Sequence, residues 1–250
     1  MITLHVADGT PEQEFGRAVA LSGEIALVGA AGDIEAVAHT FDTSTGEQLA
    51  RLISVDSTFA DRFGSDVATD DKVAIAGAPI VDGILGRTGA VYVMQPRTGA
   101  QILKMIAPDG EGSDFFGHAV AVDGGRVLIG APGAVGDAWL AGAAYVFDLT
   151  SGQMQHRLIA TERAGQSQFG NAVALDGRLG VIGAQGETAG AAVGVAYLFD
   201  LTTGTQLARV TSPRGTQDRA RRIRGGDRRW HCCRGRRVRR SGERRPCAPF

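Results

Sequence analysis

The side chains in this sequence that could support chemistry are dispersed, and no spacing joins them into a catalytic set. The chain has no Gly-x-Ser-x-Gly elbow, no His-Glu-x-x-His pair and no phosphate-binding glycine loop. His39 has neither a cysteine nor a second histidine close to it, which disfavours a role as a metal ligand. The remaining candidates are polar and aromatic loop residues, and these favour binding over bond making.

An internal repeat must position these loops. A Phe-Gly pair occurs four times, and each time its Phe precedes the alanine of a Gly-Ala pair by fifteen residues. One spacing kept in four copies indicates a repeat architecture. The four pairs are Phe15 with Ala30, Phe63 with Ala78, Phe116 with Ala131, and Phe169 with Ala184.

Each repeat is predicted to form four antiparallel strands. The first strands are expected at 18–21, 66–69, 119–122 and 172–175, and the fourth at 48–55, 101–107, 153–160 and 206–210. Tight turns of Ser-Gly, Asp-Asp or Asp-Gly sequence join the first two strands of each repeat. Four strands in about 50 residues are typical of a β-propeller blade, and a solenoid or a two-sheet sandwich is the less favoured alternative. Residues 4–7 are predicted as one further strand, the last of a preceding repeat.

A binding face on such a fold would be built by the loops that differ between repeats. These are the loops after Gly-Ala and before Phe-Gly, which are expected to open on the same side. Trp139 is the only tryptophan of residues 1–213, and it could anchor a partner or pack against its own blade. His118 is interpreted as a tolerant edge position because it varies between repeats. The candidate binding residues are Asp82, Arg87, Phe115, Asp137, Trp139 and Glu187.

The distribution of charge divides the chain into two parts. The formal net charge is −1, but residues 1–213 are strongly acidic, whereas residues 214–250 carry 14 arginines and all three cysteines. The body therefore has no disulfide to stabilise it. It also has no apolar run of the ~18–20 residues that a membrane-spanning helix needs. We expect no membrane insertion, and the start of the sequence does not have the pattern of a signal peptide.

The repeats resemble those of the FG-GAP family, which form the blades of the integrin α-subunit propeller and of many bacterial surface proteins. The motif is intact in Phe63-Gly64 with Gly77-Ala78-Pro79 and in Phe116-Gly117 with Gly130-Ala131-Pro132, whereas the first and fourth repeats lack the proline. The resemblance covers about residues 1–213. It implies a propeller that presents loops to protein or glycan ligands, often outside the cell and often with bound calcium.

We therefore expect an all-β fold, a partial β-propeller of about four blades plus one strand, with repeats at 15–62, 63–115, 116–168 and 169–213. The expected function is non-catalytic protein or glycan binding or adhesion, as part of a larger surface or secreted protein. The alternative is the propeller portion of a hydrolase or lyase, with its site at the mouth of the channel. A third interpretation treats the repeats as a spacer.

Residues 214–250 are interpreted as a disordered basic tail produced by a frameshift, and not as a specific nucleic-acid arm. Their composition changes abruptly after Pro213, and they contain no Phe-Gly near position 222, where a fifth repeat is due. Arginine, glycine, cysteine and tryptophan share G-rich codons, as expected for GC-rich DNA read in the wrong frame. The segment has almost no aliphatic residues to bury. A shifted reading of the gene that yields no fifth repeat would rule this out.

We predict that the hairpin turns bind no calcium. The family's calcium loop lies between Phe-Gly and Gly-Ala-Pro, but here it has shrunk to two-residue turns such as Asp70-Asp71 and Asp123-Gly124. Calcium takes about six to eight oxygen ligands, so one or two carboxylates are too few. Calorimetric titration should detect no site tighter than about millimolar. Micromolar binding that is lost in Asp70→Ala or Asp123→Ala would contradict this.

Overall fold

The computed structural model describes residues 3–6, 14–32, 35–56, 58–83, 86–135, 141–161, 167–186 and 194–211. They belong to one compact unit, Met1–Ser212. Within the described ranges the secondary structure is β throughout, apart from one 3-10 turn, η2 (Phe59–Asp61). None of these residues forms a helix with the length and apolar character needed to cross a membrane. Residues 214–250 lie outside the description, so the frameshift interpretation stays a prediction.

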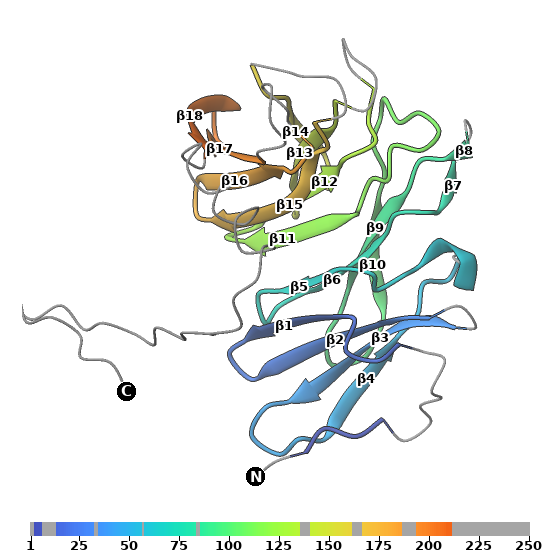
Figure 1. Ribbon diagram of the computed structural model, residues 1–250. Helices are drawn as coiled ribbons and strands as arrows, with labels where there is room; N and C mark the ends of the chain where they lie inside the picture. The colour runs from blue at the N-terminus through green and yellow to red at the C-terminus, as the bar shows by residue number, and fades with distance from the viewer. Residues whose placement is uncertain are drawn as a thin grey trace, which may run out of the picture. The chain divides into compact units, whose positions relative to one another are not determined.

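Four consecutive four-stranded antiparallel sheets, which we call blades 1 to 4, confirm the predicted propeller blades (Figure 1). Blade 1 contains β1 (Ala18–Ser22), β2 (Ile25–Ala31), β3 (Ala36–Asp42) and β4 (Gln48–Leu52). Blade 2 contains β5 (Val67–Thr69), β6 (Ala74–Ala78), β9 (Ala90–Met94) and β10 (Gln101–Met105). Blade 3 contains β11 (Ala119–Asp123), β12 (Arg126–Ala131), β13 (Ala143–Asp148) and β14 (Met154–Leu158). Blade 4 contains β15 (Phe169–Asp176), β16 (Leu179–Ala184), β17 (Val195–Asp200) and β18 (Thr205–Thr211).

Each blade is a meander in which consecutive strands pair. The first strands of successive blades contact one another, β1 with β5, β5 with β11, and β11 with β15. In blade 2 an additional two-stranded hairpin, β7 (Asp82–Gly83) with β8 (Gly86–Arg87), is inserted between the second and third strands. Its backbone meets the loop before Phe116, because Ser113 N–H donates to the carbonyl of Arg87 at 2.9 Å.

Two local predictions were wrong. Residues 3–6 carry no strand, and Ala7 lies outside the described residues. An isolated strand gains no ladder hydrogen bonds, and residues 3–6 pair with none of the described strands. The turns also lie one residue later than predicted in blades 1, 3 and 4, because the register pairs Ser22 with Ile25, Asp123 with Arg126 and Asp176 with Leu179.

In blades 2 to 4 the Phe of Phe-Gly packs between blades, as predicted, whereas Phe15 of blade 1 is 43% exposed. Phe63, Phe116 and Phe169 are at most 1% exposed, and each joins a core cluster that includes residues of the preceding blade. Each ring also lies 5.3–5.5 Å from the ring of a tyrosine on the third strand of its own blade: Tyr92, Tyr145 and Tyr197. This burial is part of the apolar contact that holds neighbouring sheets together.

The glycine of each Gly-Ala sets how closely two blades approach. A Cβ built on Gly29, Gly77 or Gly130 would overlap the carbonyl oxygen of the next Phe-Gly turn, at Gly64, Gly117 or Gly170 respectively. Only a residue without a side chain fits such an approach. Gly183 holds the same position in blade 4, yet its nearest neighbour is the Cβ of Ala172 in its own blade, at 3.5 Å.

We predict that Gly130→Ala destabilises the fold, whereas Gly183→Ala does not. The added methyl at position 130 must displace the backbone of the neighbouring blade, which should cost about 1–3 kcal/mol. At position 183 the methyl makes only ordinary van der Waals contact. Urea unfolding followed by circular dichroism measures both. Equal midpoints for the two variants would show that the close approach does not limit stability.

Candidate binding cleft

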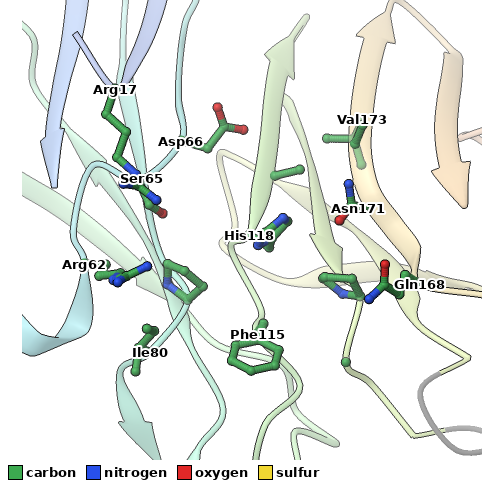
Figure 2. Close-up of a pocket in the computed structure, with 15 residues that line it drawn as sticks. Arg17, Arg62, Ser65, Asp66, Ile80, Phe115, His118, Gln168, Asn171 and Val173 are labelled. Carbon is green, nitrogen blue, oxygen red and sulfur yellow. The ribbon is translucent and has the colours of Figure 1, made fainter. Parts of the chain in front are cut away.

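An open cleft of about 700 Å³ lies beside the Phe-Gly turns (Figure 2). Its walls come from equivalent positions of successive repeats: the residue before Phe-Gly, the residue after it, and the first residues of the strand and loop that follow. These positions hold Arg62, Phe115 and Gln168, then Arg17, Ser65, His118 and Asn171, then Asp66, Ala119, Ala172, Val173, Pro79, Ile80, Pro132 and Gly133.

One tight turn presents the two variable positions in every repeat. The backbone N–H of the residue after Phe-Gly donates to the carbonyl of the residue before it, at 3.0–3.1 Å in all four copies. The glycine, third of the four turn residues, has φ between +80° and +93°. Positive φ at this position is the signature of a type II turn, which explains why glycine follows Phe. The turn backbone is therefore fixed, while the flanking side chains are free to vary.

The residue before each Phe is itself in the left-handed region although it is never glycine. The φ angles are 52° at Glu14, 57° at Arg62, 56° at Phe115 and 52° at Gln168. This conformation costs roughly 1 kcal/mol or more for a residue with a side chain. The same strained conformation therefore recurs in every copy of the turn, and three of its four residues, Arg62, Phe115 and Gln168, line the cleft.

The cleft combines cationic, polar and aromatic side chains. Figure 2 shows Arg17, Arg62 and His118 around the same space as Gln168, Asn171 and Phe115. The Arg17 guanidinium pairs with the carboxylate of Glu14 at 2.5 Å. Asp66 is the only acidic side chain among the residues that line the described cleft. Among the lining residues, side chains that can donate hydrogen bonds therefore outnumber carboxylates.

The repeats that carry these turns can be assigned to a family. The FG-GAP repeat model matches residues 2–39, 47–94, 100–147 and 153–199, which is well over half of the sequence. The chain belongs to the FG-GAP repeat family. No curated protein matches the sequence.

Among solved structures, the FG-GAP blades are similar to Kuenenia stuttgartiensis hydrazine synthase, with a TM-score of 0.55 and 13% sequence identity. The match covers 83% of this chain and 51% of that one, so the present chain spans about half the length of the similar structure. At this identity the likeness shows the fold alone.

The structure places only one of the predicted site residues in the cleft. Phe115 lines it, whereas Asp82 and Arg87 pair with each other across the β7–β8 hairpin and are not among its lining residues. Asp137, Trp139 and Glu187 lie outside the described residues, so their proposed role stays a prediction.

Apart from Phe115, sequence reasoning missed the residues that flank the FG-GAP turns. His118 was interpreted as a tolerant edge position, but it lines the cleft together with its counterparts Arg17, Ser65 and Asn171. The signal was present in the sequence, because these positions vary beside an invariant Phe-Gly. Variation next to a fixed turn is compatible with ligand recognition as well as with tolerance.

The pKa values of two titratable groups of the cleft are shifted in the direction that favours the neutral form. Burial raises the pKa of Asp66 above its ordinary value of 3.8, although its Oδ2 accepts a hydrogen bond from the backbone N–H of Val120 at 2.8 Å. Desolvation lowers the pKa of His118, and Arg17 adds to this effect while Asp66 opposes it.

The turn aspartates Asp70 and Asp123 accept hydrogen bonds from backbone N–H groups. The Oδ1 atom of Asp70 accepts the N–H groups of Lys72 and Val73, and Oδ2 of Asp123 accepts Gly177 N–H at 2.6 Å. Within the described ranges, no group of three or more histidine, cysteine, aspartate or glutamate side chains is placed to hold a metal ion. These contacts give the turn aspartates a structural role.

We predict that Asp66→Asn stabilises the protein in a pH-dependent way. A pKa that is higher in the folded state favours the fold at low pH, and this contribution is lost as the pH rises through the folded pKa. Asparagine keeps an oxygen that can accept Val120 N–H but carries no charge. Its melting temperature should match that of the wild type near about pH 3 and exceed it increasingly toward neutrality. A pH-independent difference would contradict the desolvation argument.

Proposed function

We propose that this chain is a non-catalytic FG-GAP binding module that mediates adhesion through an acidic protein or glycan ligand, as part of a larger surface or secreted protein. The observation that carries the proposal is the set of different side chains held at the same strained turn position around one cleft. A fixed backbone with variable side chains is the usual construction of a recognition surface.

The acidic character of the ligand follows from the donors in the cleft. Arg62 supplies a guanidinium group, which can bind a carboxylate in a bidentate manner, and Gln168 and Asn171 supply amide donors. Arg17 adds a second guanidinium group, one nitrogen of which pairs with Glu14. Phe115 offers an apolar face beside them. A carboxylate-bearing protein segment or an acidic sugar presents the matching acceptors.

One observation favours the alternative function, the propeller portion of a hydrolase or lyase. Asp66 and His118 share the cleft, and their pKa values are shifted in opposite directions, as acid–base pairs often are. The carboxylate of Asp66 is nevertheless engaged by backbone N–H. Turnover of an ester or glycoside that is abolished by His118→Gln would replace the binding proposal.

We predict that Arg62→Asn weakens binding of a glutamate-rich peptide and of a uronic-acid oligosaccharide. Asparagine tolerates the left-handed backbone, so the turn should survive while the guanidinium is lost. Loss of a charged hydrogen bond is worth about 1.5–3 kcal/mol, which corresponds to about tenfold or more in affinity. Fluorescence anisotropy of labelled probes at moderate salt measures the change.

The matched control is Arg97→Asn. Arg97 pairs with Glu24 at 3.0 Å on an exposed turn and does not line the cleft. The Arg97→Asn substitution removes the same charge as Arg62→Asn. Both variants keep the 14 arginines of residues 214–250, so the non-specific attraction of these arginines for acidic probes is the same in each. Equal losses in the two variants, or no binding of either probe, would contradict recognition in the cleft.

A further inference from the structure

The position after Phe-Gly holds a different side chain in every blade, and one of these side chains can change its charge. The position is occupied by Arg17 in blade 1, Ser65 in blade 2, His118 in blade 3 and Asn171 in blade 4, and all four residues line the cleft. Arginine is a permanent cation and asparagine is always neutral, whereas imidazole titrates close to neutral pH. Depending on its protonation, His118 therefore resembles either Arg17 or Asn171.

His118 lies where a ligand in the cleft can reach its side chain. The residue is exposed to solvent, and in the view of Figure 2 it lies between Ser65 and Asp66 of blade 2 and Asn171 of blade 4. Its backbone is held by the turn, because its N–H donates to the carbonyl of Phe115 at 3.0 Å. A ligand that contacts the cleft walls from blades 2 and 4 therefore meets the imidazole between them.

Few charged groups surround His118. Among the described residues that line the cleft, the other charged or titratable side chains are Arg17, Arg62 and Asp66, and the carboxylate of Glu14 pairs with Arg17. Desolvation lowers the pKa of His118, with a smaller contribution from Arg17, and Asp66 opposes both. Carboxylates of an acidic ligand would act on the imidazole in the same direction as Asp66 does. Protonation of His118 and binding of an acidic ligand therefore favour each other.

We propose that protonation of His118 raises the affinity of the cleft for an acidic ligand, so that the module binds at mildly acidic pH and releases the ligand as the pH rises. This inference rests on the proposed function, because it concerns the same cleft and the same ligand. By linkage, a ligand that binds imidazolium more tightly than imidazole raises the pKa of His118 when it binds. The affinity is then highest below the pKa of the free protein and falls as the pH rises through the higher pKa of the complex.

Asp66 changes its charge in the direction that adds to this effect. Burial raises the pKa of Asp66, and its protonation removes a negative charge that repels an acidic ligand. The same protonation removes the neighbour that stabilises the imidazolium of His118, so the two titrations are coupled. The imidazole has an ordinary pKa of 6.5 and the carboxyl one of 3.8, so we expect His118 to contribute more near neutral pH.

The first test takes its substitutions from other repeats, whose turns already contain them. His118→Asn copies blade 4, and His118→Arg copies blade 1. Fluorescence anisotropy measures binding of the glutamate-rich peptide and the uronic-acid oligosaccharide from about pH 8 to about pH 5, where most probe carboxylates stay ionised. The affinity of the wild type should rise about tenfold over this range, the worth of one charged hydrogen bond. His118→Asn should bind weakly and His118→Arg tightly at every pH.

The matched control is His156→Gln. A ring nitrogen of His156 lies 3.1 Å from the carbonyl oxygen of Thr202, and the residue does not line the cleft. This variant should keep the pH dependence of the wild type, and loss of the dependence here would overturn the assignment to His118. Binding by the wild type at one affinity across the pH range would overturn this inference and leave the proposed function intact. Absence of binding at every pH would overturn both.

A second measurement separates His118 from Asp66. The imidazole C–H signal of His118, identified by its absence from His118→Asn, reports the pKa of this group by nuclear magnetic resonance. Saturation with the uronic-acid oligosaccharide should raise that pKa by about one pH unit, which matches a tenfold change in affinity, and an unchanged pKa would overturn the proposal.

The Asp66→Asn variant completes the comparison. It should bind more tightly than the wild type near neutral pH, because it lacks the carboxylate that repels an acidic ligand. Its pH dependence should persist but move to lower pH, since the neighbour that stabilises the imidazolium of His118 is gone. If the pH dependence instead disappears in Asp66→Asn, the carboxyl group is the titrating group and the proposal for His118 is wrong.

Discussion

The structure depends on one backbone contact between neighbouring blades. In blades 2 to 4 the carbonyl of the Phe-Gly turn occupies the space where the Gly-Ala glycine of the preceding blade would carry a side chain. The two halves of the motif, although adjacent within one repeat, therefore serve different interfaces. The Phe-Gly of a repeat contacts the blade before it, and its Gly-Ala contacts the blade after it. This explains why both halves recur at one spacing, because each blade must fit two neighbours at once.

Ion pairs also join neighbouring blades at their fourth strands. The Nζ atom of Lys104 on β10 contacts the carboxylate of Asp56, which follows β4 of the preceding blade, at 2.6 Å. Arg157 on β14 repeats the contact with Asp109 at 2.8 Å. The hydrogen bond from Lys104 lowers the pKa of Asp56. The pKa of Lys104 is raised: desolvation acts to lower it, but the hydrogen bonds with Asp56 and Tyr92 outweigh that effect. These pairs are partly exposed and add less than the aromatic packing beside them.

The sequence was sufficient to predict the blades because their signals are local. The fifteen-residue spacing, the strand pattern and the turn glycines lie within one repeat, and the observed strands follow them closely. Two details differ from the prediction. Residues 3–6 have strand-forming side chains but pair with none of the described strands. The turn register depends on which glycines adopt positive φ, such as Gly124 and Gly125.

The candidate cleft was harder to predict for a related reason. Its lining residues stand about 50 residues apart and converge only because the turns share a backbone conformation. The sequence analysis placed the binding residues in the long loops that vary between repeats. The residues that line the cleft are instead single variable positions beside the invariant Phe-Gly. Arg62, Phe115 and Gln168 occupy one structural position and differ completely in chemistry.

In a repeat fold each blade contacts its neighbours, and stability is approximately the sum of blade terms and interface terms. Phe63, Phe116 and Phe169 are buried in the contacts between neighbouring blades. The cleft is lined by residues of all four blades, from Arg17 in blade 1 to Asn171 in blade 4. The arrangement of its side chains therefore depends on the contacts that hold neighbouring blades together.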